Sequence, residues 1–83
     1  MSTTREQDAA RKKALCARLA RVEGQVRGLQ RLIQADSEPE KVAQQMAAAR
    51  KALDKSFYAL ISGLMADQRV NADEAADLLL RFA

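Results

Sequence analysis

The sequence predicts an all-α protein, on three observations. Helix-forming residues dominate the 83-residue chain, which has only three glycines and one proline. Apolar residues recur at helical spacing over long stretches. Patterns typical of helix starts occur at three places in the chain. We therefore expect one domain over residues 1–83, with helices at about 4–35, 38–66 and 72–82.

The first expected helix starts at Thr3-Thr4-Arg5-Glu6, which has the S/T-x-x-E form of a capping box. Its apolar residues follow the alternating spacing of a heptad repeat. They are Leu15, Leu19, Val22, Val26, Leu29 and Ile33. On the opposite side of this helix lie four small residues, Ala17, Ala20, Gly24 and Gly28. This pattern predicts a helix packed along its seam and approached closely by another backbone at its rear.

A second capping box, Ser37-Glu38-Pro39-Glu40, predicts the next helix, with Ser37 as N-cap and Pro39 in the first turn. Its apolar stripe is Val42, Met46, Ala49, Leu53, Phe57, Leu60 and Leu64. Near its end this helix is apolar on more than one side, which indicates a partner chain. Asn71-Ala72-Asp73-Glu74 repeats the cap pattern and predicts the short last helix.

The residue inventory excludes several classes of function. The chain has no histidine and one cysteine, so it has no imidazole metal site, CxxC motif or intrachain disulfide. No nucleophile, base and orienting group can be assembled, so we expect neither an enzyme nor a cofactor. There is no apolar run long enough to span a membrane, and the start lacks a signal-peptide core. We therefore expect a cytoplasmic location.

Charge is unevenly distributed along the chain, whose net charge is +3. Residues 1–35 hold eight basic and three acidic side chains, whereas residues 36–83 hold six basic and eight acidic ones. An arginine-rich first half is suited to binding phosphates. The alternative interpretation is a solvated helix face.

Two stretches of the sequence resemble the CsoR/RcnR/FrmR family, small bacterial repressors that sense copper, nickel, cobalt or formaldehyde. They are Arg18-Leu19-Ala20-Arg21-Val22-Glu23-Gly24-Gln25-Val26-Arg27-Gly28 and Ala48-Ala49-Arg50-Lys51-Ala52-Leu53-Asp54-Lys55. The resemblance runs from about residue 5 to Arg81-Phe82. It implies a three-helix protomer, an antiparallel four-helix dimer core, and a homotetramer built as a dimer of dimers. It also implies binding to operator DNA through basic residues, and an effector held between protomers.

The resemblance places DNA contacts at two basic residues. Arg18 and Lys55 match DNA-contact positions of the family, whereas Arg21, Arg50 and Lys51 are weaker candidates. Lysine and arginine contacts to phosphate position a protein on a duplex without reading its sequence. The alternative for each residue is a solvated charge.

The sequence departs from the family at its ligand positions. The sensing cysteine falls at Pro39, the histidine at Leu64 and the second cysteine or histidine at Gln68. These side chains offer no thiolate or imidazole, so we expect no family-type metal site and no cysteine-based formaldehyde sensing. If the pocket persists, Pro39, Tyr58, Leu64 and Gln68 would line a mostly apolar space for an uncharged organic molecule. The alternative is that side chains fill it.

Three hypotheses follow. The leading one is a DNA-binding repressor whose effector is a non-metal small molecule or absent. The second is a helical interaction module that forms mixed tetramers with a metal-sensing relative. The third is a redox or electrophile sensor at Cys16, because nearby Lys12, Lys13 and Arg18 favour a reactive thiolate; otherwise Cys16 is a packing residue.

Overall fold

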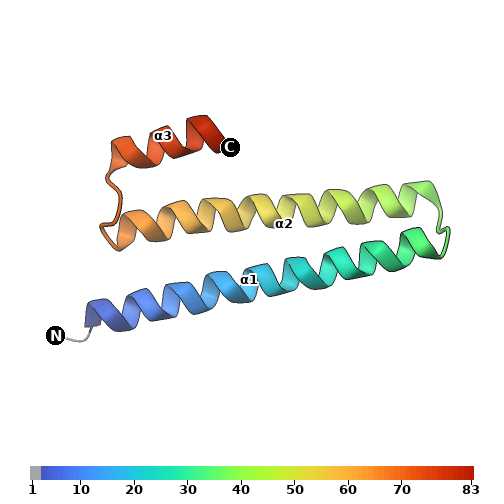
Figure 1. The fold of residues 1–83 in the computed structure, drawn as a ribbon, viewed down its shortest axis with the longest axis horizontal. Helices are drawn as coiled ribbons and strands as arrows, with labels where there is room; N and C mark the ends of the chain where they lie inside the picture. The colour runs from blue at the N-terminus through green and yellow to red at the C-terminus, as the bar shows by residue number, and fades with distance from the viewer. Residues whose placement is uncertain (1–2) are drawn as a thin grey trace.

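The chain folds into three α-helices over residues 3–83, the part that the computed structural model describes. Helix α1 spans Thr3–Gln34, α2 spans Pro39–Ala66 and α3 spans Ala72–Phe82. Figure 1 shows α1 and α2 antiparallel and side by side, with α3 turned back along the side of α2 that faces away from α1. The molecule is a thin slab of 53 × 29 × 12 Å. The all-α class is confirmed, and every helix end lies within one residue of its expected position.

Both long helices end in the same backbone motif. After α1, the N–H of Asp36 donates to the carbonyl of Ile33 (3.1 Å), and that of Ser37 donates to Leu32 (3.0 Å). This pair of bonds is a Schellman motif, which places one residue in the left-handed region. That residue is Asp36 after α1 (φ 53°) and Gln68 after α2 (φ 59°). Neither is glycine, so both turns carry some backbone strain.

The expected capping of α2 is wrong in one respect. Its N-cap is Glu38 (φ −56°, ψ 137°), not Ser37, and no side chain caps the helix. Proline disfavours the helical region for the residue before it, so Glu38 stays extended and the helix begins at Pro39. The backbone of Ser37 instead closes the end of α1.

The cap of α3 is as predicted. The Asn71 side chain accepts a hydrogen bond from the Glu74 backbone N–H (2.8 Å), and the Glu74 carboxylate accepts one from the Asn71 N–H (3.0 Å). The capping box expected at Thr3 depends on side chains outside the described part of the chain.

The heptad seam of α1 divides into two rows. Val22 and Leu29, seven residues apart, are buried against α2 at 9% and 8% exposure. Leu19, Val26 and Ile33, also seven residues apart, are between 41% and 52% exposed. Only half of the seam therefore packs within the chain.

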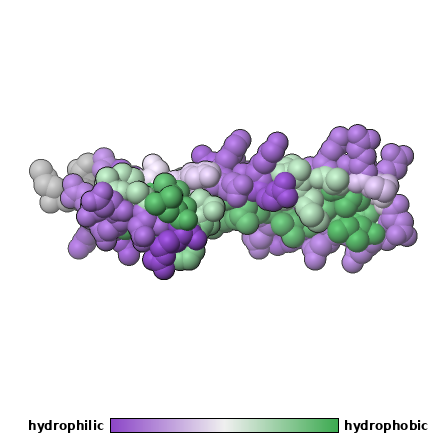
Figure 2. Space-filling view, turned by 90° about the horizontal axis from the view of Figure 1, so that it is seen from above, coloured by the Kyte–Doolittle hydropathy of each residue, from purple (hydrophilic) through white to green (hydrophobic). Residues whose placement is uncertain are grey.

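Helix α2 is divided in the same way. Ala49 and Ser56, again seven residues apart, are buried, whereas Met46, Leu53 and Leu60 are 39% to 51% exposed. The exposed rows of the two helices share one side, since Leu19, Leu53 and Leu60 line one hollow and Ile33 and Met46 line another. We call these six residues the apolar face: Leu19, Val26, Ile33, Met46, Leu53 and Leu60. Hydrophobic side chains reach the surface in several patches along the molecule (Figure 2).

Candidate nucleic-acid interface

A hollow of about 260 Å³ opens between α1 and α2 on the side opposite the apolar face. Its lining residues are Arg11, Ala14, Leu15 and Arg18 from α1, and Ala59, Ser62, Gly63 and Ala66 from α2. Leu15 also lines the hollow that contains Leu53 and Leu60, so it lies on the row of contacts that separates the two sides. Ser62 follows Leu60 by two residues, which turns it about 200° around the helix.

The two leading DNA-contact candidates share this side. Arg18 lines the hollow, and Lys55 stands four residues before Ala59 and seven before Ser62, on the same face of α2. Both side chains are exposed, and neither takes part in an ion pair within the described residues. The structure thus brings Arg18 and Lys55 to one surface.

The weaker candidates are divided between the two sides. Arg21 lies three residues after Arg18, and Lys51 lies four residues before Lys55, so both border the same surface. Arg50 is turned about 140° from Lys55 around α2, toward the apolar side. Helical position therefore separates Arg50 from the other four basic residues.

Besides Arg11 in the hollow, a second basic residue on this surface escaped the sequence analysis. Lys41 precedes Lys55 by fourteen residues, two heptads, which puts it at the same helical position. We call the resulting surface the basic face: Arg18, Arg21, Lys41, Lys51 and Lys55. Between these cations the same helical positions hold small or neutral side chains, namely Ala14, Gln25, Gly28 and Leu32 on α1, and Gln45, Ala48, Ala52, Ala59, Ser62 and Ala66 on α2. No Asp or Glu of the two described helices occupies these positions, so phosphates would meet no opposing charge there.

Polar side chains also fill the middle of this side. The Gln45 amide donates to the backbone carbonyl of Gln25 at 3.5 Å, and an added Cβ at Gly28 would lie 3.9 Å from the Gln45 nitrogen, in ordinary contact. Gly24 meets nothing within 4 Å. The close approach of another backbone expected at these glycines is therefore absent within the protomer at both Gly24 and Gly28, since the one neighbour of Gly28 within 4 Å is a side-chain atom.

An ion pair between Arg11 and Asp67 fixes the end of the hollow. Arg11 donates through Nη1 to the Asp67 carboxylate, and the two side chains are 38% and 11% exposed. It is the one ion pair between distant parts of the chain among the described residues. The others join neighbouring turns of a single helix: Lys12 with Asp8, Arg27 with Glu23, and Arg81 with Asp77. The pair therefore ties the first third of α1 to the end of α2.

The four residues expected around an effector pocket lie in four separate hollows of the protomer. Pro39 lies beside Ile33 and Met46 near the α1–α2 turn, and Gln68 lies beside Asn71 at the α2–α3 turn. Leu64 and Tyr58 lie in two further hollows. One protomer alone therefore does not assemble the expected pocket.

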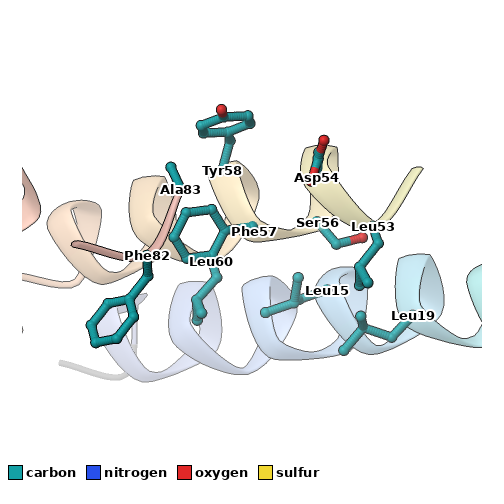
Figure 3. Close-up of a pocket in the computed structure, with 10 residues that line it drawn as sticks. All are labelled: Leu15, Leu19, Leu53, Asp54, Ser56, Phe57, Tyr58, Leu60, Phe82 and Ala83. Carbon is teal, nitrogen blue, oxygen red and sulfur yellow. The ribbon is translucent and has the colours of Figure 1, made fainter. Parts of the chain in front are cut away.

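The hollow that contains Tyr58 has a volume of about 420 Å³. In Figure 3, Leu15 and Leu19 of α1 face Leu53 and Leu60 of α2, whereas the ring of Tyr58 points away from α1. The end of α3 supplies Phe82 and Ala83 to its edge. This hollow is part of the apolar side of the molecule.

Within the described residues, no group of three or more His, Cys, Asp or Glu side chains is placed to hold a metal ion. No described helix is long and apolar enough to cross a membrane. Cys16 is exposed on α1.

Comparison with known proteins decides the family. Residues 11–81 match the family model described as a metal-sensitive transcriptional repressor. The chain belongs to this family. Its members are regulators rather than enzymes, in agreement with the sequence prediction. Neither the curated proteins nor the solved structures gave a match.

Proposed function

We propose that this repressor binds operator DNA through its basic face, with Arg18 and Lys55 on the phosphates. The observation that carries the proposal is that both residues lie on one side of the α1–α2 pair, among neutral and small side chains. Lysine and arginine contacts supply the salt-dependent part of DNA affinity. A molecule 53 Å long covers about 16 base pairs at 3.4 Å per pair.

The apolar face is, in this proposal, the contact between two copies of the chain. Few large side chains are buried within one protomer, and a chain of this size that buries so little apolar surface is only marginally stable alone. Rows of apolar residues at seven-residue spacing pack as knobs into holes against similar rows. Two such faces would form the antiparallel four-helix core, with a basic face exposed on each outer side. Two of these dimers would form the tetramer.

The effector of this repressor is proposed to be a non-metal molecule or absent. Copper, zinc, nickel and cobalt sites need thiolate or imidazole ligands. The positions that hold them in the family carry Pro39, Leu64 and Gln68 here. A molecule that relieves repression would have to bind the released state more tightly than the DNA-bound state.

The test is fluorescence anisotropy with the duplex upstream of the protein's own gene, beside a scrambled duplex of equal length, at two salt concentrations. We expect tighter binding to the native duplex at the higher salt, unchanged by added copper, nickel or cobalt. Equal and steeply salt-sensitive binding to both duplexes would contradict the repressor and favour the mixed oligomer with a metal-sensing relative. Release by a metal would contradict the proposed effector class.

A further inference from the structure

The hollow lined by Arg11, Arg18 and Ser62 combines two guanidinium groups and a hydroxyl from two different helices. Such donors are the ones that bind phosphate oxygens in proteins, and arginine adds a planar, permanently charged group. The rest of the lining is mostly small, with Ala14, Ala59, Gly63 and Ala66. These residues leave the space between the donors open. From this arrangement we infer that the hollow is a subsite for one phosphoryl group.

Arg11 is held in place before any ligand arrives. Its ion pair with Asp67 lies at the end of the hollow, and its Cδ lies beside Gly63, where an added Cβ would be 3.8 Å away, in ordinary contact. A guanidinium has five N–H donors, and the bond to Asp67 uses one of them. A side chain ordered in advance loses less conformational entropy when it binds.

The balance of charge in the hollow depends on Arg18. Asp67 offsets the charge of Arg11, whereas Arg18 has no ion-pair partner within the described residues. Ser62 contributes a donor without charge from α2. The subsite thus has one uncompensated cation, which matches the single charge of a DNA phosphodiester.

This inference rests on the proposed DNA-binding function, because Lys55 lies two turns of α2 before Ser62 and continues the same surface. The phosphoryl group has two sources, the DNA backbone and free inorganic phosphate. The position beside the basic face favours the DNA backbone. In that case Ser62 adds affinity for DNA of any base sequence, because a contact to phosphate does not distinguish one base from another.

The decisive variant is Ser62→Ala, which removes the hydroxyl and keeps the helix. We expect it to weaken binding to native and scrambled duplexes alike, by roughly threefold to tenfold, the usual effect of losing one hydrogen bond. The slope of affinity against salt should stay unchanged, because a neutral donor displaces no counterion. The matched control is Ser37→Ala at the α1–α2 turn, which should bind like the wild type.

Two further variants keep the inference falsifiable. Ser62→Glu places a carboxylate in the hollow and should reduce DNA binding at least tenfold, with circular dichroism confirming that the helices persist. The double variant Ser62→Ala/Arg18→Ala should lose less affinity than the two single losses combined, because both groups act on one phosphate. Wild-type affinity in Ser62→Ala and Ser62→Glu, beside weakened Arg18→Ala, would overturn the subsite and leave the proposed function intact.

Inorganic phosphate distinguishes the two sources. Thermal unfolding without DNA is measured in phosphate and in chloride at equal ionic strength. A rise of the melting temperature in phosphate that disappears in Ser62→Ala would assign the subsite to free phosphate as well as DNA. This measurement also tests the subsite if the protein binds no DNA. In that case, equal melting temperatures in phosphate and in chloride would overturn the subsite.

Discussion

The apolar and basic faces are two sides of one pair of helices, and they differ in almost every property. The apolar face presents large aliphatic side chains at regular seven-residue intervals, such as Leu19 and Val26 on α1. The basic face presents cations separated by alanine, glycine and glutamine. Both flank the same row of buried contacts, which includes Val22 and Leu29. A two-helix layer therefore has two open sides, and in the proposed function each side takes a different partner.

In the proposed function, this difference lets so small a chain form an assembly and also present a binding surface. A large apolar side chain that is half exposed gains free energy when a second copy covers it, at about 25 cal/mol for each Å² removed from water. A cation on the basic face would lose hydration under such a cover, so that side stays open for a charged partner. The two interactions are thus separable by single substitutions.

The largest effect is expected from Leu53→Asp, which breaks the apolar face. Leu53 is 51% exposed in the protomer, so the change is tolerated within one chain, but a partner would bury the new carboxylate without a counter-charge. An unpaired buried charge costs several kcal/mol, and we expect the assembly to dissociate. Analytical ultracentrifugation measures the change in mass.

Gln44→Asp is the matched control, because it adds the same carboxylate to the opposite side of α2. It should leave the mass unchanged and weaken DNA binding, since it lies two turns from Lys51. A Leu53→Asp protein with the wild-type mass would show that the exposed rows are not the assembly contact.

The second effect is expected from Arg18→Ala and Lys55→Ala, which act on the basic face alone. Each variant removes one phosphate-binding cation, so each should lower the slope of log affinity against log salt by about one. Anisotropy at four salt concentrations measures this slope, and ultracentrifugation should show an unchanged mass.

Arg27→Ala and Arg50→Ala are the controls for charge. Arg27 is an exposed residue of α1 paired with Glu23, and Arg50 lies toward the apolar side of α2. Both variants remove one positive charge, so a general effect of net charge would weaken all four proteins equally. Equal losses would contradict a DNA surface confined to one side.

Much of this arrangement can be predicted from the sequence, because the heptad spacing and the helix-start patterns are local. The division of the α1 seam into a buried and an exposed row cannot be predicted in this way. Val22 and Val26 are chemically alike, and only the position of α2 decides which of them is buried. The Arg11–Asp67 ion pair cannot be predicted from the sequence either, because its two members are 56 residues apart. The sequence analysis named Arg50 and Lys51 together as weaker DNA-contact candidates, whereas their helical positions place them on different sides of α2.

The smallest effect is expected at a position outside both faces, the turn after α2. Gln68 adopts a left-handed conformation (φ 59°) that glycine adopts without strain. Gln68→Gly should therefore raise the stability by roughly 0.5 to 1 kcal/mol, a few degrees in melting temperature at fixed protein concentration. Neither the mass nor the DNA affinity should change.

Asp36→Gly separates backbone strain from other effects at the turn. Asp36 closes α1 in the same motif (φ 53°), but aspartate tolerates this region better than glutamine because its short side chain can bond to nearby backbone. The gain in stability from Asp36→Gly should therefore be smaller than the gain from Gln68→Gly. If Gln68→Gly lowered stability while Asp36→Gly did not, the Gln68 side chain would have to make a contact whose stabilising free energy exceeds the cost of the backbone strain. If the mass of the Gln68→Gly assembly changed as well, that contact would lie between two copies of the chain. The turn after α2 would then be part of the surface on the apolar side.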